Sequence, residues 1–377
     1  MLERLVGYDT TSRLSNLELI RFIEAYLQDC GVASTLQFNA EGTKANLVAT
    51  IGPNVPGGVV LSGHTDVVPV DGQDWASDPF TVSEKDGKLY GRGTADMKGF
   101  IACALAAVPM FQAANLKRPV HLAFTYDEEV GCLGIQSLLP LLKDTVAAPR
   151  LVVVGEPTSM QVANAHKGQH VSKTRIWGRE AHSSRPEDGV NAVAIAAELI
   201  TFVTALATKA RMDGPKDEMF DPPYTSFNVG PIKGGSAFNI IPNYCEFDWE
   251  FRAVPTADPE AILVEYNDFL DDVINPHLQA TSPECRVENT VWAYLPPLKA
   301  EPGADAETLA LMLAGRNDTT VVAFGTEAGH LQSIDFPTVV CGPGDIAQAH
   351  KPDEFIALSQ LEACDGFMKR LADALKS

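Results

Sequence analysis

The sequence lacks four features, each of which would have indicated a different class of protein. Its seven cysteines are scattered and never spaced as CxxC, which argues against structural zinc on thiolates and against a disulfide framework. Basic residues number 29 against 49 acidic ones, and a net charge of −20 offers no basic surface to a nucleic acid. No stretch approaches the ~20 apolar residues that cross a bilayer, and no signal peptide opens the chain. We therefore expect a cytoplasmic protein with reduced cysteines and neither membrane nor nucleic acid as partner.

Length and apolar runs indicate more than one domain, because 377 residues are too many for one compact core. Runs typical of strands buried on both faces are VVLSG (59–63), VHLAFTY (120–126), RLVVVG (150–155) and PTVVCG (337–342). Helical periodicity occurs at 100–111, at the C-terminus, and in an early helix for which Ser15 and Glu18 suggest a capping box. This alternation predicts an α/β domain with a mixed, largely parallel sheet sandwiched by helices.

The middle of the chain has a different pattern. Between about residues 167 and 298, runs such as HVSKTRIWG and YCEFDWEFRAV alternate polar with apolar residues, as in an antiparallel sheet with one wetted face. Helices are expected from Val190 and over 258–274. This β-α-β-β-α-β order predicts an inserted α+β domain of the split-βαβ, ferredoxin-like type at 168–297. The first domain would then be discontinuous, comprising residues 1–167 and 298–377.

Potential metal ligands follow the predicted buried strands. Ligands of open α/β sheets bind beyond the carboxyl ends of the strands, and there the chain places His64, Glu128, Glu129, Glu156 and His350. A glycine-rich loop before the helix at 100–111 adds Asp96. Imidazole and carboxylate suit zinc or a similar divalent ion. If two ions lie ~3.5–4 Å apart, they need a shared carboxylate, for which Asp96 is the candidate.

Two further roles are suggested by spacing. Asp66 lies two residues after His64, on the same side of an extended chain, and can hold the second imidazole nitrogen. The adjacent Glu128 and Glu129 suggest that one binds metal while the other moves protons. A single acid at a strand end is usually a helix cap or a surface residue, but several at one sheet edge favour a site. The other histidines lack this arrangement and are expected to be non-ligands, namely residues 121, 166, 170, 277 and 330.

The segments SGHTDVVP, GRGTADMKG, DEEVG, GEPT and AHKPDE together resemble the two-zinc aminoacylase and carboxypeptidase-G2-like metallopeptidase family, over nearly the whole chain. The resemblance implies that Asp96 bridges two metal ions and precedes a cis peptide bond to Met97. It assigns His64 and Glu156 to one ion, and Glu129 and His350 to the other. Glu128 would be the general base, with Asp66 orienting His64. Zinc is expected, with cobalt, manganese or a single ion left open.

The resemblance also makes the insert a lid and dimerisation domain. His182 resembles the family histidine that reaches across a homodimer to the partner's scissile carbonyl. Asn239 and Arg252 resemble residues that bind the α-carboxylate of the substrate, which suits an amide and a guanidinium. Taken alone, Arg252 is better explained by a salt bridge on a strand and Asn239 by a turn. The apolar helix near 190–203 would be consistent with a partner surface.

The expected substrate is a small N-acyl amino acid, and FGTEAGHLQ (324–332) favours one of them. Its GTEAG segment resembles that of the acetylornithine deacetylase branch, so Glu327 would pair with the cationic side chain of acetylornithine. Glu327 could equally be a solvated loop acid. The alternatives are another N-acyl-amino-acid deacylase, a succinyl-diaminopimelate desuccinylase, a dipeptidase, or a non-catalytic metabolite-binding relative.

Overall fold

The computed structural model describes residues 1–376, and they form two compact units. Unit 1 comprises residues 1–166, 298–322 and those from Thr326 onward; unit 2 comprises residues 167–297 and 323–325. All seven cysteines are free thiols. The helices and strands of unit 1 are α1 (Leu2–Val6), α2 (Leu17–Asp29), β1 (Ser34–Phe38), β2 (Ala45–Ile51), β3 (Val59–His64), β4 (Ser83–Lys85), β5 (Lys88–Tyr90), α3 (Lys98–Ala113), β6 (Val120–Thr125), α4 (Leu133–Thr145), β7 (Leu151–Pro157), β8 (Val162–His166), α8 (Asp305–Ala314), β15 (Thr319–Val322), α9 (Ala328–Gln332), β16 (Thr338–Gly342), β17 (Phe355–Ala357) and α10 (Leu358–Ala374).

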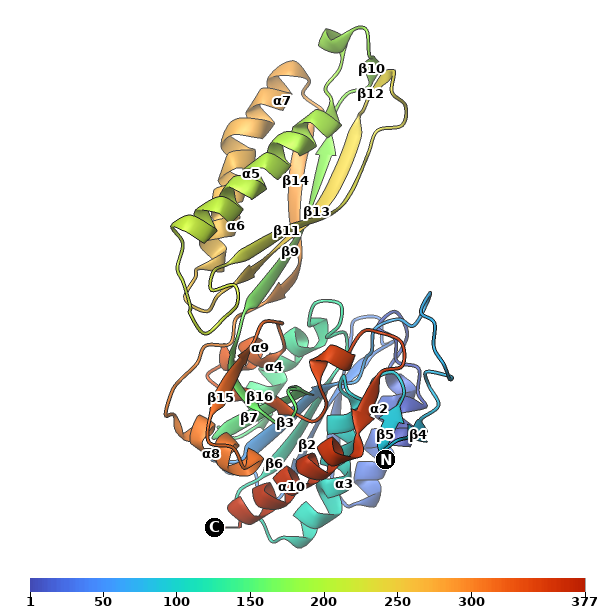
Figure 1. Cartoon of the computed structure of the whole chain (residues 1–377), viewed down its shortest axis with the longest axis vertical. Helices are drawn as coiled ribbons and strands as arrows, with labels where there is room; N and C mark the ends of the chain where they lie inside the picture. Colours follow the sequence, from blue (N-terminus) through green and yellow to red (C-terminus); the bar gives the residue numbers. More distant parts are fainter. Residues whose placement is uncertain (377) are drawn as a thin grey trace. The chain divides into compact units, whose positions relative to one another are not determined.

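Unit 1 is a three-layer α/β structure (Figure 1). Its eight-stranded sheet has the order β1-β2-β6-β3-β7-β16-β8-β15. The central strands β6, β3, β7 and β16 are parallel, whereas β1, β2 and the β16–β8 contact add antiparallel pairings. Helices α2, α3, α8 and α10 pack on one face, and α4 and α9 lie on the other. The prediction of a mixed, largely parallel sheet between helices is confirmed.

Residue choice explains how closely these layers pack. The central strands β3, β6 and β7 are buried at every position, as expected for strands covered on both faces. Gly155 in β7 lies directly against α3, where a Cβ atom would come within 2.0 Å of the Phe100 ring. The missing side chain lets α3 approach the sheet, and α3 begins two residues after Asp96.

One local prediction for unit 1 is wrong. The buried stripe of α2 is the expected one, formed by Leu19, Ile20, Ile23 and Leu27. However, the N-cap is Asn16, which makes no side-chain cap bond, and the Ser15 hydroxyl accepts from the Leu17 N–H at 3.2 Å rather than from Glu18. The Asn16 amide instead donates to the Ala45 carbonyl and the Thr65 hydroxyl, both at 2.9 Å. Tertiary hydrogen bonds therefore replace the expected capping box.

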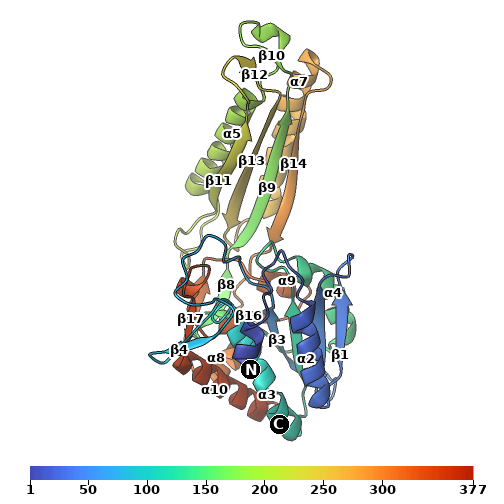
Figure 2. The same cartoon turned by 90° about the vertical axis from the view of Figure 1, so that its right-hand side faces the viewer.

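Unit 2 is a four-stranded antiparallel sheet of order β11-β13-β9-β14, with helices against one face (Figure 2). Strands β9 and β13 alternate buried and partly exposed residues along their whole length, as the sequence pattern predicted. Two-residue strands β10 and β12 pair beyond the main sheet. The elements are β9 (Gly168–Trp177), β10 (Ala181–His182), α5 (Ala192–Met212), β11 (Ser226–Gly234), β12 (Ile240–Ile241), β13 (Tyr244–Ala253), α6 (Pro259–Phe269), a π-helical turn (Leu270–Ile274), α7 (Asn275–Thr281) and β14 (Arg286–Leu295).

Helix α5 corrects the statement that no stretch is apolar enough to cross a bilayer. It is 21 residues long, and an 18-residue window within it has a mean hydropathy of 1.6, so length and composition alone would allow a span. Threonines and Glu198 interrupt the apolar run, which is why a search for an uninterrupted stretch misses it. The helix packs Ala196, Leu199 and Val203 against the sheet of unit 2, but only 28% of its apolar window is buried there. The expected absence of a membrane partner stays a prediction.

Candidate metal centre

The carboxyl ends of three neighbouring parallel strands bring the candidate ligands together in unit 1. His64 is the last residue of β3, and Glu156 is the next-to-last residue of β7. Glu128 and Glu129 follow the end of β6, which pairs in parallel with β3. Adjacent parallel strands end at one edge of the sheet, so this convergence follows from the topology that the sequence predicted.

Asp96 lies between two groups of ligand atoms. One group is His64, Asp96 and Glu156, and the other is Asp96, Glu129 and His350. Within each group the candidate ligand atoms are all within 4.8 Å of one another. The two carboxylate oxygens of Asp96 are divided between the groups: Oδ1 is 3.0 Å from His64 Nε2, and Oδ2 is 3.3 Å from His350 Nε2. One carboxylate could therefore bind an ion on each side.

The outer members of the two groups complete this arrangement. Glu156 Oε1 is 3.7 Å from His64 Nε2, and Glu129 Oε2 is 3.0 Å from His350 Nε2. His64, Asp96 and Glu156 are buried, whereas the His350 side chain is 55% exposed. The peptide bond between Asp96 and Met97 is cis, as the family resemblance implied.

The charges of this cluster are not balanced by protein groups alone. Burial and the Asp96 carboxylate raise the pKa of Glu129 to about 7, and they hold the pKa of Glu156 well above its usual value. Burial would raise the pKa of Asp96, but hydrogen bonds from His350 and His64 outweigh it and leave that pKa below the usual value. One buried oxygen each of Glu129 and Glu156 has no hydrogen-bond partner. Unpaired buried carboxylate oxygens beside imidazoles are the donor set that a divalent cation needs.

Glu128 belongs to neither group but lies beside them. Burial holds the pKa of its carboxyl well above the usual value, and His64 partly opposes this effect. The thiol of Cys132 lies 3.5 Å from Glu128 Oε1. A buried carboxylate with a raised pKa holds a proton more readily than an ordinary glutamate, which suits a group that accepts and returns one.

Asp66 uses its carboxylate differently from the prediction. His64 Nδ1 is 2.9 Å from the main-chain carbonyl of Asp66 but 3.7 Å from the carboxylate, so the main chain holds the imidazole. The carboxylate accepts hydrogen bonds from the main-chain N–H groups of Glu128 and Glu129, at 3.1 and 3.3 Å, and from the Ser12 hydroxyl at 2.7 Å. Asp66 therefore holds the loop that carries the two glutamates.

Several residues that support the site were not singled out from the sequence. Lys44 contacts both the Asp127 carboxylate and the Ser12 carbonyl, which ties the start of the glutamate loop to the N-terminal segment. The buried Glu354 carboxylate accepts hydrogen bonds from the main-chain N–H groups of Ala95 and Asp96, at 2.9 and 3.1 Å. Glu354 could have been identified from the sequence, because it lies inside the AHKPDE segment that also contains His350. Nothing in the sequence distinguished Ser12 or Lys44.

Glu327 is buried, with 1% of its surface exposed, and neither carboxylate oxygen has a hydrogen-bond partner. Burial raises its pKa to about 7, although the nearby Thr125 hydroxyl partly offsets this rise. The alternative reading of Glu327 as a solvated loop acid is therefore wrong.

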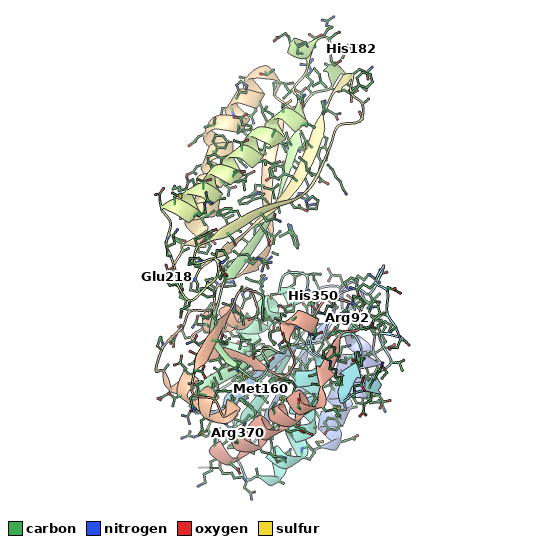
Figure 3. The ribbon with its side chains drawn as sticks, in the orientation of Figure 1. Arg92, Met160, His182, Glu218, His350 and Arg370 are labelled. Carbon is green, nitrogen blue, oxygen red and sulfur yellow. The ribbon has the colours of Figure 1, made fainter. Side chains whose placement is uncertain are left out.

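The predicted residues of unit 2 fall at opposite ends of its sheet. His182 in β10 pairs with β12, and the Asn239 carbonyl accepts a hydrogen bond from the Ser183 N–H at 3.0 Å. These residues lie at the end of the unit where Figure 3 labels His182. Arg252 is near the other end of β13, about 26 Å along the strand from Tyr244 at ~3.3 Å per residue. One chain therefore does not bring Asn239 and Arg252 together on one carboxylate.

His182 and Arg252 also have local partners. The Ser184 N–H donates to His182 Nδ1 at 3.1 Å, which makes Nδ1 an acceptor and leaves the ring proton of the neutral imidazole on Nε2. Arg252 lies 3.5 Å from the Glu250 carboxylate, so the strand-face salt bridge expected for an arginine here is present.

Comparisons with known proteins agree with this site. Residues 60–374 match the model of "Peptidase family M20/M25/M40". An acetylornithine deacetylase from Proteus mirabilis is 37% identical over 97% of this chain and 92% of its own length. The M20 family metallo-carboxypeptidase Sso-CP2 from Sulfolobus solfataricus is similar in fold, with a TM-score of 0.75 at 18% identity over 99% of this chain and 98% of that one. The YXEP protein of Bacillus subtilis, described as a dinuclear metal binding peptidase from this family, has a TM-score of 0.61 at 17% identity over 100% and 96%. This chain belongs to peptidase family M20/M25/M40, in agreement with the resemblance read from its motifs.

Proposed function

We propose that this protein is a metal-dependent amidohydrolase that converts N2-acetyl-L-ornithine to L-ornithine and acetate, a step of arginine biosynthesis. The observation that carries the proposal is the pair of ligand groups sharing Asp96, with Glu128 buried beside them. The 37% identity to an acetylornithine deacetylase over nearly the full length supports this substrate. We further propose a cytoplasmic location, which the seven free thiols support.

The donor set fits two divalent cations, and we propose zinc. His64, Glu156 and one oxygen of Asp96 would hold one ion, and Glu129, His350 and the other oxygen of Asp96 would hold the second. Mixed imidazole and carboxylate ligands suit zinc, and they also accept cobalt or manganese. Positive charge here would relieve the mutual repulsion of the carboxylates, which burial otherwise makes costly.

Glu128 is the proposed general base and acid. Bound divalent cations would lower the pKa of a coordinated water and polarise the acyl carbonyl. Glu128 accepts the proton of the attacking water and later delivers it to the leaving amine, for which its raised pKa is suited. Asp66 holds the main chain of Glu128, so the carboxylate meets the water in a fixed position. His182, with its proton on Nε2, would donate a hydrogen bond to the carbonyl oxygen as negative charge develops there.

Glu327 is the proposed recognition group for the substrate's side-chain ammonium. Its two oxygens are buried without partners, and an ammonium would supply the missing donors together with the opposite charge. Asn239 and Arg252 are the proposed partners of the substrate's α-carboxylate. Since they lie at opposite ends of unit 2, they would act on one substrate from two subunits.

We therefore propose a homodimer in which each active site is completed by the partner's copy. His182 and Asn239 lie at the same end of unit 2, and both are exposed. They would enter the site of the partner subunit together. The exposed face of α5 and the edge strand β11 offer surface for such a contact.

An amine-release assay tests the proposed reaction. The purified protein, loaded with zinc or cobalt, would be offered N2-acetylornithine, N-acetylmethionine, N-succinyl-diaminopimelate and simple dipeptides, with a chelator-treated sample as control. We expect N2-acetylornithine to give the highest kcat/KM, and the activity to disappear with chelator and return with metal. A higher kcat/KM for a dipeptide or the succinyl compound would contradict the substrate assignment, and no hydrolysis of any of them would contradict the reaction.

A further inference from the structure

His350 is the one candidate ligand here whose position burial does not fix. It lies eight residues beyond β16, its side chain is 55% exposed, and its main chain has a φ of 63°, in the left-handed region. A side chain in such a loop would be free to move unless its backbone were held. The His350 carbonyl accepts a hydrogen bond of 3.0 Å from the amide nitrogen of Gln73.

The Gln73 amide can be oriented in only one way. Its oxygen accepts from Arg92 Nη2 at 2.6 Å and from Trp75 Nε1 at 3.0 Å. Arginine and tryptophan side chains donate but do not accept hydrogen bonds, so they must face the oxygen. The NH₂ group therefore faces the His350 carbonyl.

Arg92 connects Gln73 to the other ligand loop. Figure 3 labels Arg92 and His350 in the same part of unit 1. The Arg92 guanidinium, which is buried, pairs with the buried Glu354 carboxylate at 2.7 Å. Glu354 in turn accepts from the Asp96 N–H at 3.1 Å. Hydrogen bonds thus run from Asp96 through Glu354, Arg92 and Gln73 to His350.

The two ends of this network touch different parts of the site. Glu354 holds Asp96, which belongs to both ligand groups. Gln73 holds His350, which belongs only to the group with Asp96 and Glu129. Loss of Gln73 should therefore affect one cation and spare the other.

We propose that Gln73 is a positioning residue that fixes His350, and that it sets the affinity of the Asp96–Glu129–His350 group for its cation independently of the His64–Asp96–Glu156 group. The inference rests on the proposed metal-dependent function. Removing an outer partner of a metal ligand typically lowers metal affinity by about 10- to 100-fold, and this is the change expected for one of the two ions.

The test is a cobalt titration of the metal-free full-length protein, followed by calorimetry and by the visible spectrum of bound cobalt. We expect two binding events in the unsubstituted protein. In Gln73→Ala one dissociation constant should rise about 10- to 100-fold while the other stays within about twofold. Gln73→Glu keeps an acceptor for Arg92 and Trp75 but offers the His350 carbonyl no donor, so it should weaken the same ion even if its melting temperature is unchanged.

Gln112→Ala is the matched control, because its amide also donates to main-chain carbonyls, those of Cys30 and Gly31, but away from the ligands. It should leave both cobalt affinities unchanged. Two unchanged affinities in both Gln73 variants would overturn the inference, and so would an equal loss of both, which would indicate a general structural role. An unsubstituted protein that binds no cobalt would overturn the proposed metal-dependent function as well.

Discussion

Glu327→Gln should make the metal-free protein more stable and, when loaded with metal, less selective. In the folded chain burial raises the Glu327 pKa from 4.5 to about 7, a rise worth about 3 kcal/mol. Because the folded-state pKa is above the unfolded one, the charged carboxylate costs stability at high pH, and this cost disappears as the pH falls below the unfolded value. Glutamine has the same shape and no charge to bury.

The stability arm uses denaturant unfolding of metal-free protein at pH 8 and pH 5. We expect Glu327→Gln to raise the free energy of unfolding by about 3 kcal/mol at pH 8 and by about 1 kcal/mol at pH 5. Glu84→Gln provides a control, because the Glu84 side chain is exposed and removing its charge relieves no cost of burial. An equal effect at the two pH values, or a loss of stability at pH 8, would refute the reasoning that Glu327 is an unpaired buried charge.

The activity arm compares N2-acetylornithine with N2-acetylnorleucine, in which a methyl group replaces the side-chain ammonium. A hydrogen bond to a charged group is worth about 1.5–3 kcal/mol, so kcat/KM for N2-acetylornithine should fall about 10- to 100-fold in Glu327→Gln. The value for N2-acetylnorleucine should stay nearly constant or rise. An equal loss with both substrates would contradict recognition of the ammonium by Glu327.

Three more predictions concern single residues. Glu128→Gln should retain its metal content while kcat falls by at least about 100-fold, and a fully active variant would contradict the role of Glu128. Mixing inactive Glu128→Gln and His182→Ala proteins, after subunit exchange, should recover about a quarter of the unsubstituted activity if His182 acts in the partner's site; no recovery would argue against a shared site. Burial lowers the His121 pKa to about 4, below the unfolded value of 6.5, so its neutral form stabilises the fold and this stability is lost as the pH falls below 6.5. Between pH 7.5 and pH 5 the free energy of unfolding should therefore fall by about 2 kcal/mol less in His121→Asn than in the unsubstituted protein. Denaturant unfolding at the two pH values measures this difference, and an identical pH dependence would contradict the assignment.

Periodicity and strand-end position were enough to predict the layers of unit 1 and the convergence of His64, Glu156 and the Glu128–Glu129 pair. These features follow from rules that act locally or at the level of sheet topology. Asp96 and His350 lie in loops, yet their positions in the sequence already made both of them candidate ligands, and Asp96 the candidate shared carboxylate. The family resemblance added how the ligands divide between two ions, and the division of the two Asp96 oxygens is visible only in the folded chain.

The sequence did not predict the hydrogen bonds between segments that lie far apart in the chain. The Asn16 amide donates to the Ala45 carbonyl in β2 and to the Thr65 hydroxyl instead of capping α2. The Asp66 carboxylate accepts from Ser12 and from the main-chain N–H groups of Glu128 and Glu129 instead of holding the His64 ring. Nothing in the sequence indicated a role for Gln73, because a glutamine in a loop is ordinarily exposed to solvent. Such contacts join segments far apart in the chain, and no local pattern records them.

Anomalous diffraction from crystals of the zinc-loaded protein tests the central claim most directly. Two peaks are predicted, both in contact with Asp96, one also within about 2.0–2.2 Å of His64 and Glu156 and the other within that distance of Glu129 and His350. Peaks elsewhere, or no bound metal in a protein that still releases ornithine from N2-acetylornithine, would contradict the account.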